Sequence, residues 1–335
     1  MSTIAITGAS GKLGNATLSA LLSHNLLPAS SIIALTSSSS PSSPTWASLA
    51  AQNPSIRIRH ADFDDPASFE KALQGVDKLF LVSSPHVELD FEDEGGREKG
   101  DGEGRERHHR VAIDAAVKAG IGHVYYSSLA FAWDAGAQAP GDASKAVVMR
   151  AHLRTQAYLG WLGGEGRVRC SVVRMGLYHE SWPLYVFGYG DAKEVERETV
   201  PVLGDGRVCW TAIRDLGVAS AVVLAADSKE YEGKTFYLST RPAEAKNLAE
   251  IAAIASQARG KEVKVQVVSR EVYEKYYIEG RGRNKASVRW WSSTYDAIKD
   301  GECEVDDPTL ERLLESVGVK STGIEEYIQS SFKKA

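Results

Sequence analysis

Cysteine is scarce in this chain of 335 residues, and its three cysteines, Cys170, Cys209 and Cys303, stand far apart without any Cys-x-x-Cys pair. This spacing excludes a disulfide framework and a zinc site built on paired cysteines. Each cysteine is therefore expected to be a small buried apolar side chain. We expect no bound metal and a reducing compartment, the cytoplasm.

Long apolar runs and an excess of positive charge are missing as well. No stretch reaches the roughly 18 consecutive apolar residues that a membrane span needs. The chain enters its first strand at residue 3, so we expect neither a membrane segment nor a signal peptide. The net charge of −5 gives no electrostatic basis for binding nucleic acid or an anionic membrane.

A glycine-rich turn near the N-terminus is the first positive signal. Residues 3–7 predict a strand, residues 15–23 predict a helix, and Gly8, Gly11 and Gly14 lie between them. Such a turn lets a pyrophosphate approach the backbone and the free N–H groups at the start of the helix. Its spacing, G-x-x-G-x-x-G, is a variant of the dinucleotide-binding fingerprint, and a turn without a ligand is the alternative. The cofactor contacts expected here are Gly8, Ser10, Gly11, Lys12, Leu13 and Gly14.

The end of the second predicted strand, residues 31–36, bears on the choice of cofactor. An acidic residue there would bind the ribose of NAD, and an arginine would favour the 2′-phosphate of NADP. This chain instead has Thr36 followed by Ser37 and three further serines. Without the acid, the serine turn together with Lys12 favours NADPH, with NADH as the second option. The alternative is a flexible serine-proline loop with no role in binding.

Acidic residues follow the third predicted strand, residues 56–61. Asp62 and Phe63 stand where the adenine ring of a dinucleotide would lie, so both are cofactor candidates. Asp65 precedes Pro66 and is expected to cap the next helix.

Strands and helices continue to alternate along the chain. Strands are expected at 78–82, 123–126 and 167–174, and helices at 111–119 and 146–162. This alternation predicts an α/β fold with a Rossmann-type doubly wound parallel sheet. Ligands of such sheets bind at the carboxyl ends of the strands. The cofactor candidates at these ends are Ser83, Ser84, Pro85, Ser127 and Ser128.

Residues 88–110 interrupt the alternation. They are dense in Glu, Asp, Arg and Gly, with almost nothing apolar after Phe91. Such a segment cannot bury enough apolar surface to order itself, so we expect a solvated insertion. A mobile lid over the cofactor is the alternative.

The pattern loosens after residue 177. We expect a Rossmann domain at 1–177, completed by returning elements at 208–240, and a smaller C-terminal α+β substrate lobe made of 178–207 and 241–335. Asp215 is expected to cap a helix at 216–226. The lobe is expected to hold helices at 248–258, 270–278, 308–317 and 323–332 and a strand at 263–268.

Taken in order, these motifs resemble a known family. Ala5-Ile-Thr-Gly-Ala-Ser-Gly-Lys-Leu-Gly14, Leu81-Val-Ser-Ser84, Tyr126-Ser-Ser-Leu129 and Arg174-Met-Gly-Leu-Tyr178 resemble the NmrA-like branch of the atypical short-chain dehydrogenases, in particular its NAD(P)H:quinone oxidoreductase members. The resemblance implies an extended Rossmann domain, NADP(H) as cofactor with Gly176 in contact with it, and reduction of a conjugated carbonyl compound such as a quinone. The family's Arg-Asn-Gly-Trp-Tyr is altered here, and the charged insertion is longer than usual.

The sequence offers three candidates for a proton donor. A typical short-chain dehydrogenase uses Tyr-x-x-x-Lys on the helix after the fifth strand. That helix has no such pair here, and the match at Tyr295-Asp-Ala-Ile-Lys299 comes too late in the chain. His152 stands where related enzymes carry a lysine or a histidine, so it is expected to donate a proton or to bind the nicotinamide ribose. Tyr178 and Lys145 are the other catalytic candidates.

The substrate side of the site is expected to be aromatic. Phe131, Tyr178, His179 and Trp182 are the candidates, although Tyr178 could equally be a packed core residue. A flat wall for an aromatic substrate could come from Trp133, Trp182, Trp210, Trp290 and Trp291, of which only one or two are expected to line a pocket while the others are core residues.

These residues lead to one main hypothesis, an NADPH-dependent reductase of a flat conjugated or aromatic carbonyl compound. A non-catalytic NADP(H) sensor that binds a partner protein is the rival, and an isomerase or cyclase that retains the cofactor is a third option. An apolar pocket between Tyr178 and the C-terminal lobe would favour the enzyme. A filled crevice with an exposed apolar patch elsewhere would favour the sensor. A homodimer is compatible with each.

Overall fold

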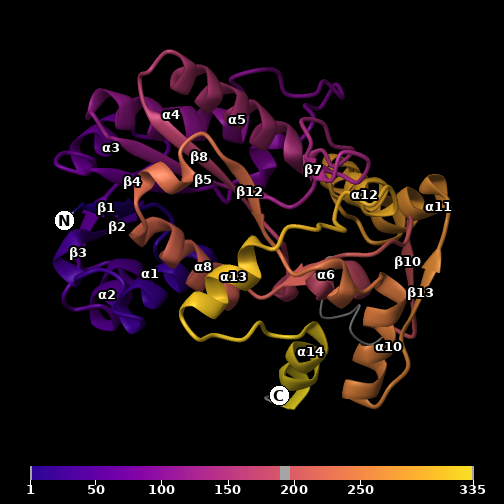
Figure 1. Cartoon of the computed structure of the whole chain (residues 1–335). Coiled ribbons are helices and arrows are strands. Elements are labelled where there is room, and N and C mark those ends of the chain that lie inside the picture. The colour runs from indigo at the N-terminus through magenta and orange to yellow at the C-terminus, as the bar shows by residue number, and fades with distance from the viewer. Residues whose placement is uncertain (1, 189–196, 334–335) are drawn as a thin grey trace.

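A seven-stranded parallel sheet forms the centre of the computed structural model, which describes residues 2–188 and 197–333 (Figure 1). The strand order is β12-β8-β5-β4-β1-β2-β3. The chain leaves β3 at one edge and re-enters the sheet as β4 beside β1, which confirms the doubly wound sheet. The strands are β1 (Ile4–Ile6), β2 (Ile32–Thr36), β3 (Arg57–His60), β4 (Lys78–Val82), β5 (His123–Leu129), β8 (Arg169–Met175) and β12 (Thr235–Leu238).

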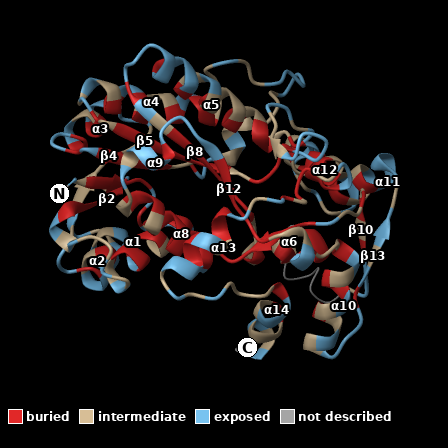
Figure 2. Cartoon of the chain, in the orientation of Figure 1, coloured by how far each residue is buried: buried red, intermediate tan, exposed pale blue. Residues whose placement is uncertain are grey.

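Helices cover both faces of this sheet, and the buried residues follow its strands (Figure 2). Because successive side chains of a strand point to opposite faces, Ile4 and Ile6 pack in one helical layer and Ala5 in the other. The first layer holds α1 (Lys12–Ser23), α2 (Pro44–Gln52), α8 (Ile213–Ala225) and α13 (Thr309–Ser316). The second holds α3 (Pro66–Ala72), α4 (Arg105–Lys118) and α5 (Val148–Gly164).

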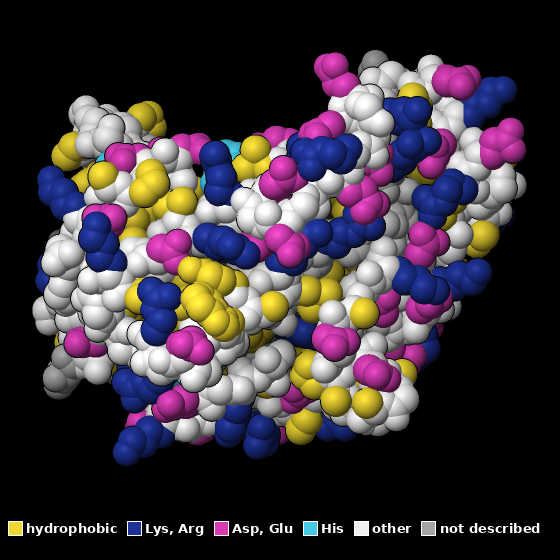
Figure 3. Space-filling model, turned by 90° about the horizontal axis from the view of Figure 1, so that it is seen from above, with side chains coloured by type: hydrophobic (Ala, Val, Ile, Leu, Met, Phe, Trp, Pro, Cys, Tyr) yellow, Lys and Arg dark blue, Asp and Glu magenta, His cyan; other side chains and the backbone are white. Residues whose placement is uncertain are grey.

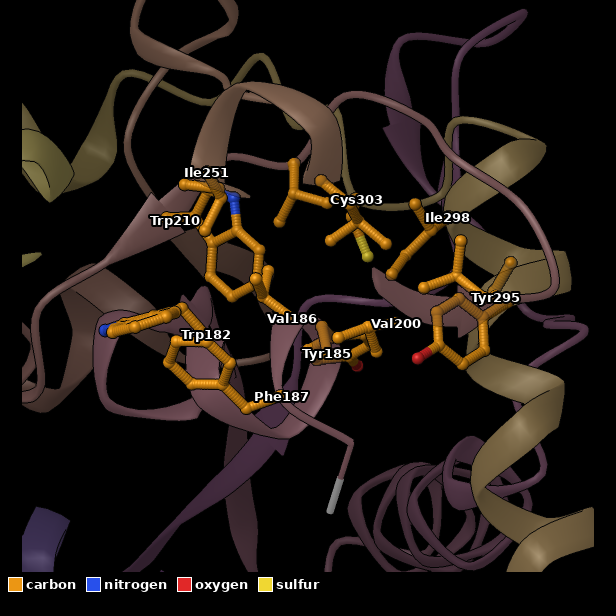
Figure 4. Packing of buried hydrophobic residues seen from close by; sticks show 14 of the residues in the cluster. Trp182, Tyr185, Val186, Phe187, Val200, Trp210, Ile251, Tyr295, Ile298 and Cys303 are labelled. Atoms are coloured by element: carbon orange, nitrogen blue, oxygen red, sulfur yellow. The ribbon is translucent and has the colours of Figure 1, made fainter. Parts of the chain in front are cut away.

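A further group of elements lies to the right of the sheet in Figure 1 and encloses a core of its own, rich in aromatic side chains (Figure 4). Its two short strands, β10 and β13, pair in parallel. Residues 189–196, within the expected lobe segment 178–207, lie outside the described residues. The group comprises α6 (Trp182–Val186), β10 (Thr199–Val202), α10 (Leu248–Arg259), β13 (Lys264–Val267), α11 (Arg270–Glu274), a π-helix (Lys275–Gly280), α12 (Lys285–Lys299) and α14 (Ile324–Lys333).

Short elements complete the fold. They are the strands β6 (Trp133–Asp134), β7 (Ala139–Pro140), β9 (Leu177–Tyr178) and β11 (Trp210–Thr211), the helix α9 (Ser228–Tyr231), and the 3₁₀ helices η1 (Ala29–Ser31), η2 (Val87–Asp90), η3 (His179–Ser181) and η4 (Pro242–Glu244).

Helix caps agree with the sequence at one position and differ at another. The Asp65 carboxylate accepts a hydrogen bond from the Ala67 N–H at 3.1 Å, which confirms it as the cap of α3. Asp215, in contrast, does not cap α8, which begins after Ala212. Its buried carboxylate instead accepts from the Thr322 N–H at 2.6 Å, so it fastens the C-terminal segment to α8.

The prediction for residues 88–110 is wrong at its C-terminal end. The helix expected from residue 111 begins six residues earlier, and Arg105, Glu106, His108 and His109 are buried in its first turns. Arg105, His108 and His109 are met by partners from other elements, and Glu106 by Gly102 and by Arg110 of the same helix, and composition alone does not reveal such partners.

The surface shows no grouping of one charge on the face seen in Figure 3, where Lys and Arg side chains alternate with Asp and Glu. Among residues 2–188 and 197–333, no helix has the length and apolar character needed to cross a membrane. Nor do the described side chains include a group of three or more His, Cys, Asp or Glu that could hold a metal ion.

Candidate active site

The glycine-rich turn between β1 and α1 depends on glycine at two positions. Gly8 has a φ of +58°, in the left-handed region that glycine adopts readily. A Cβ atom on Gly14 would lie 2.2 Å from the carbonyl oxygen of Gly8, so α1 can start against the turn only with glycine there. Gly11 closes the turn by donating its N–H to the same oxygen at 2.8 Å.

The start of α1 is built to receive an anion. Gly11 is the N-cap residue and supplies no side chain to cap the helix. Ser10, Gly11 and Lys12 are exposed, and Leu13 is buried beneath them. The N–H groups of the first turn therefore stay available for phosphate oxygens. These residues fit the pyrophosphate of a dinucleotide.

The ends of β2 and β3 lie beside this turn in the strand order. Thr36 is buried, and its hydroxyl oxygen accepts from the Ser38 N–H at 3.3 Å, which leaves Ser37 exposed at the strand end. Asp62 and Phe63 are half-buried just beyond β3. The placement of these residues is compatible with contacts to the ribose and adenine, which stay predictions.

A cavity of about 260 Å³ opens where β4, β5 and β8 end. It lies between these strand ends and the helices α5 and α12, which matches the pocket expected between Tyr178 and the C-terminal part of the chain. No carboxylate is found among the described residues that line it. The lining is Val82, Ser83, Ser84, Pro85, Val87, Arg105, Ser127, Ser128, Leu129, Ala130, Phe131, Val148, His152, Met175, Gly176, Leu177, Tyr178, Ser181, Tyr185, Trp290, Trp291 and Thr294.

Nine of the residues predicted from the sequence meet in this lining. Each follows or ends a strand of the sheet, or lies on the helix after β5, so the topology brings them together. They are Ser83, Ser84, Pro85, Ser127, Ser128, Phe131, His152, Gly176 and Tyr178.

Three predicted residues are not brought to the cavity. The Lys145 side chain is 58% exposed, and its ammonium group pairs with Asp300. His179 follows Tyr178 but is buried on the other side of the chain, with its ring 5.4 Å from that of Tyr327. This reversal follows from the alternation of side chains in extended backbone.

Trp182 is the third of these residues. It is buried in the core of Figure 4, with its ring centroid 5.2 Å from that of Phe187. The pocket is lined instead by Trp290 and Trp291 on α12. Of the tryptophans considered for an aromatic wall, the structure therefore places two on α12 at the cavity and leaves Trp182 outside its lining.

His152 is the central polar residue of the cavity. Its side chain is buried, and its Nδ1 lies 2.8 Å from the hydroxyl oxygen of Tyr126. Its Nε2 is buried without a hydrogen-bond partner among the described residues. Burial lowers the pKa of His152 well below its usual value, and the positive charge of Arg105 lowers it further. The imidazole is therefore neutral near pH 7.

Tyr178 is the second polar group at the cavity. It is half-buried, and burial raises the pKa of its hydroxyl, which keeps it protonated. Glycine at position 176 lets this part of the backbone pass close to β11. A Cβ atom on residue 176 would lie 2.2 Å from Thr211 Oγ1.

Arg174, the first residue of the same motif, has a structural role. Its guanidinium donates to the carbonyl oxygen of Gly141 at 2.7 Å and to Gln156 Oε1 at 2.8 Å. The Gln156 amide in turn donates to Ser128 Oγ at 2.8 Å. Arg174 therefore fixes the loop after β5 and one serine of the cavity.

Several residues of the site were not found from the sequence. His109 and Tyr126 contact each other and lie behind His152, and Arg105 lies at the rim. The adjacent pair His108-His109 inside a charged segment was the available signal. The helix α12 was not predicted either, although Trp290 and Trp291 on it were among the tryptophans considered for an aromatic wall.

Solved structures resemble this chain along almost its whole length. NADPH-dependent quinone oxidoreductase QOR2 from Escherichia coli, complexed with NADPH, gives a TM-score of 0.75 at 27% identity and covers 98% of this chain and 100% of its own. The Citrobacter sp. triphenylmethane reductase complexed with NADP(H) gives a TM-score of 0.74 at 27% identity. The match covers 98% of this chain and 99% of that one.

Sequence comparison agrees with these structures. Quinone oxidoreductase 2 of Escherichia coli (strain K12) is 30% identical over 266 residues, which are 79% of this chain and 78% of that protein. The NmrA-like family matches residues 1–328. With this match and the Rossmann-type sheet described above, the chain belongs to the NmrA-like family.

Proposed function

We propose that the protein is an NADPH-dependent oxidoreductase that reduces a flat, conjugated or aromatic carbonyl compound of the quinone or enone type. The observation that carries this proposal is the cavity at the ends of β4, β5 and β8. It combines an aromatic wall with one buried imidazole nitrogen that has no partner among the described residues. An apolar pocket with few convergent polar groups is typical of a small-molecule site.

The residues that would hold NADPH lie along one edge of the sheet. The first turn of α1 would bind the pyrophosphate, and Lys12 with Ser37 would meet the 2′-phosphate. The serines after β4 and β5 and Gly176 would border the nicotinamide. When bound, NADPH supplies a hydride from its nicotinamide ring. The NADPH and NADP(H) complexes of the two similar structures support this choice.

The protein side of the reaction rests on the aromatic wall and on two polar groups. Trp290 and Trp291 line the cavity with aromatic rings, which suit a planar conjugated substrate. His152 and Tyr178 place an imidazole nitrogen and a protonated hydroxyl at the same cavity. Both can donate hydrogen bonds to an oxygen on which negative charge develops. The absence of a carboxylate among the described lining residues disfavours a cationic substrate.

Turnover with a panel of acceptors tests this proposal. The purified full-length protein is mixed with NADPH and with quinones and enones in turn, and the absorbance of reduced nicotinamide is followed. We expect oxidation with at least one acceptor. Tyr178→Phe should lower kcat/KM by about fivefold, the effect of one lost hydrogen bond.

Lys145→Ala is the matched control and should keep the wild-type rate, because its side chain is largely exposed and paired with Asp300. Tight NADPH binding without oxidation of any acceptor would contradict the proposal and favour the NADP(H) sensor.

A further inference from the structure

Three buried aromatic side chains, His152, Tyr126 and His109, form a continuous chain of hydrogen bonds. The hydroxyl oxygen of Tyr126 on β5 lies 3.2 Å from Nδ1 of His109 on α4. The same oxygen lies 2.8 Å from Nδ1 of His152. All three are at most 1% exposed. At such depth each donor and acceptor needs a partner, so the direction of every bond can be worked out.

The proton of His109 is placed by the backbone. The Ser84 N–H, which can only donate, points at His109 Nε2 at 3.2 Å, so this nitrogen carries the lone pair. The Ser83 hydroxyl lies 3.0 Å from the same nitrogen. The single proton of the neutral ring is therefore on Nδ1. It is donated to Thr155 Oγ1 at 2.8 Å, whose own proton goes to the Ala151 carbonyl oxygen.

This arrangement determines the direction of the next two bonds. Tyr126 cannot donate to His109 Nδ1, because that nitrogen is protonated. Of the two ring nitrogens within 3.2 Å of the Tyr126 hydroxyl oxygen, only His152 Nδ1 can then accept, and at 2.8 Å it is the nearer one, so the Tyr126 O–H donates there. The proton of His152 is then on Nε2, the nitrogen without a partner on the side of the ring away from Tyr126.

We propose that His109 and Tyr126 are positioning residues that hold His152, a residue of the cavity wall, in the neutral tautomer with its proton on Nε2, and that this N–H binds the carbonyl oxygen of the substrate. The inference rests on the proposed function for the identity of that oxygen. His152 is then a fixed hydrogen-bond donor and not the source of the transferred proton. If His152 gave up its Nε2 proton, a replacement could come through Tyr126 and His109 only if His109 took up a proton on its own Nε2. The Ser84 N–H points at that nitrogen and opposes its protonation.

The charges around the ring favour the same state. Arg105 and His109 on α4 and Arg174 on β8 lie near His152. Positive charge on any of them disfavours a second positive charge on the His152 imidazole. Burial lowers the pKa of His109 as well. A neutral pair of imidazoles joined by a tyrosine hydroxyl satisfies every buried group except Nε2, which is the one left for a ligand.

Nuclear magnetic resonance of the full-length protein labelled with ¹⁵N-histidine tests this directly, with NADPH present. We expect a His152 spectrum with protonated Nε2 and bare Nδ1, unchanged between about pH 6 and pH 8. Tyr126→Phe should mix the two tautomers. Tyr125→Phe is the matched control, since this buried neighbour on β5 points to Ser228 on the opposite face and should leave the spectrum as in the wild type.

Turnover supplies a second readout. His152→Gln keeps an N–H donor at similar reach but cannot titrate, so it should retain about tenfold more activity than His152→Ala. Equal loss in both variants would overturn the donor role. A protonated Nδ1 in the wild type, or an unchanged spectrum in Tyr126→Phe, would overturn the tautomer lock. If no acceptor is reduced, the proposed function fails while the spectra still decide the tautomer.

Discussion

Asp90 and Arg105 form a buried ion pair at the rim of the cavity, with Arg105 Nε donating to Asp90 Oδ2 at 2.6 Å. The side chains are only 8% and 4% exposed. The Arg105 N–H also donates to Asp90 Oδ1 at 2.8 Å, so one carboxylate fixes both the side chain and the first N–H group of α4. The pair thus joins η2 to α4 beside the substrate cavity.

Removing the carboxylate is expected to be costly. Asp90→Ala would leave the guanidinium buried without its partner, which lowers the free energy of unfolding by about 3–5 kcal/mol. Urea denaturation followed by circular dichroism measures this. Asp93→Ala is the control, because its pair with Arg97 is exposed and screened by solvent and should contribute little to stability. Equal losses of unfolding free energy in the two variants would contradict a larger contribution from the buried Asp90–Arg105 pair.

Contacts of buried polar side chains explain why the prediction for residues 88–110 is wrong at its C-terminal end. A segment rich in charge is normally solvated, and residues 94–98 are indeed exposed. The buried part is ordered by partners far away in the sequence, such as Thr155 for His109 and Val148 for Arg105. Only the packed fold brings these groups together, so no local pattern could predict the burial.

The glycine turn gives a second prediction. Gly14→Ala would place a methyl group 2.2 Å from a backbone oxygen, so we expect a stability loss of about 1–3 kcal/mol and at least tenfold weaker NADPH binding. Thermal unfolding and a fluorescence titration with NADPH check both effects. Gly160→Ala on α5 is the control, because a Cβ there meets nothing within 4 Å and should stabilise the helix by up to about 1 kcal/mol.

Cofactor choice gives a third prediction. Ser37→Asp adds a negative charge at the end of β2, where a 2′-phosphate would lie, so NADPH affinity should fall about tenfold or more while NADH binding is kept or improved. Titration with both cofactors measures the ratio. Thr45→Asp adds the same charge in the first turn of α2 and should leave the ratio near that of the wild type. A similar ratio in all three proteins would remove Ser37 from the cofactor site.

Acid sensitivity gives a fourth prediction. Burial lowers the pKa of His123 and of His179 to about 4. The unfolded chain binds protons at these residues near pH 6.5, whereas the folded chain does not. Stability should therefore be full above about pH 6.5 and fall as the pH drops toward 4, by up to about 1.4 kcal/mol per pH unit for each residue.

Urea denaturation at several pH values measures this slope. His123→Gln keeps an N–H donor for Ser171 and cannot titrate, so it should flatten the slope. His86→Gln is the control, since its side chain is 51% exposed, and it should leave the slope unchanged. A slope that His123→Gln does not alter would contradict the assignment.

The sequence predicted the half of the site that belongs to the sheet. Ser83, Ser127, Gly176 and Tyr178 follow strands, and parallel strands place their carboxyl ends at one edge, so chain order alone brings them together. The other half comes from α12, whose Trp290 and Trp291 reach the cavity through tertiary packing. No spacing rule links residue 290 to residue 178, so the sequence could not tell which of the five candidate tryptophans line the cavity, and Trp182 was assigned to the site.

A single-turnover experiment tests hydride transfer at this cavity. Enzyme saturated with NADPH is mixed anaerobically with excess quinone, and nicotinamide absorbance is followed by stopped flow, with deuterium at either face of nicotinamide C4 in parallel runs. We expect full oxidation of the bound NADPH, slowed by deuterium at one face only, because a nicotinamide bound at the strand ends would present one face to the cavity. Bound NADPH that persists unoxidised, or decay that neither label slows, would contradict hydride transfer at this site.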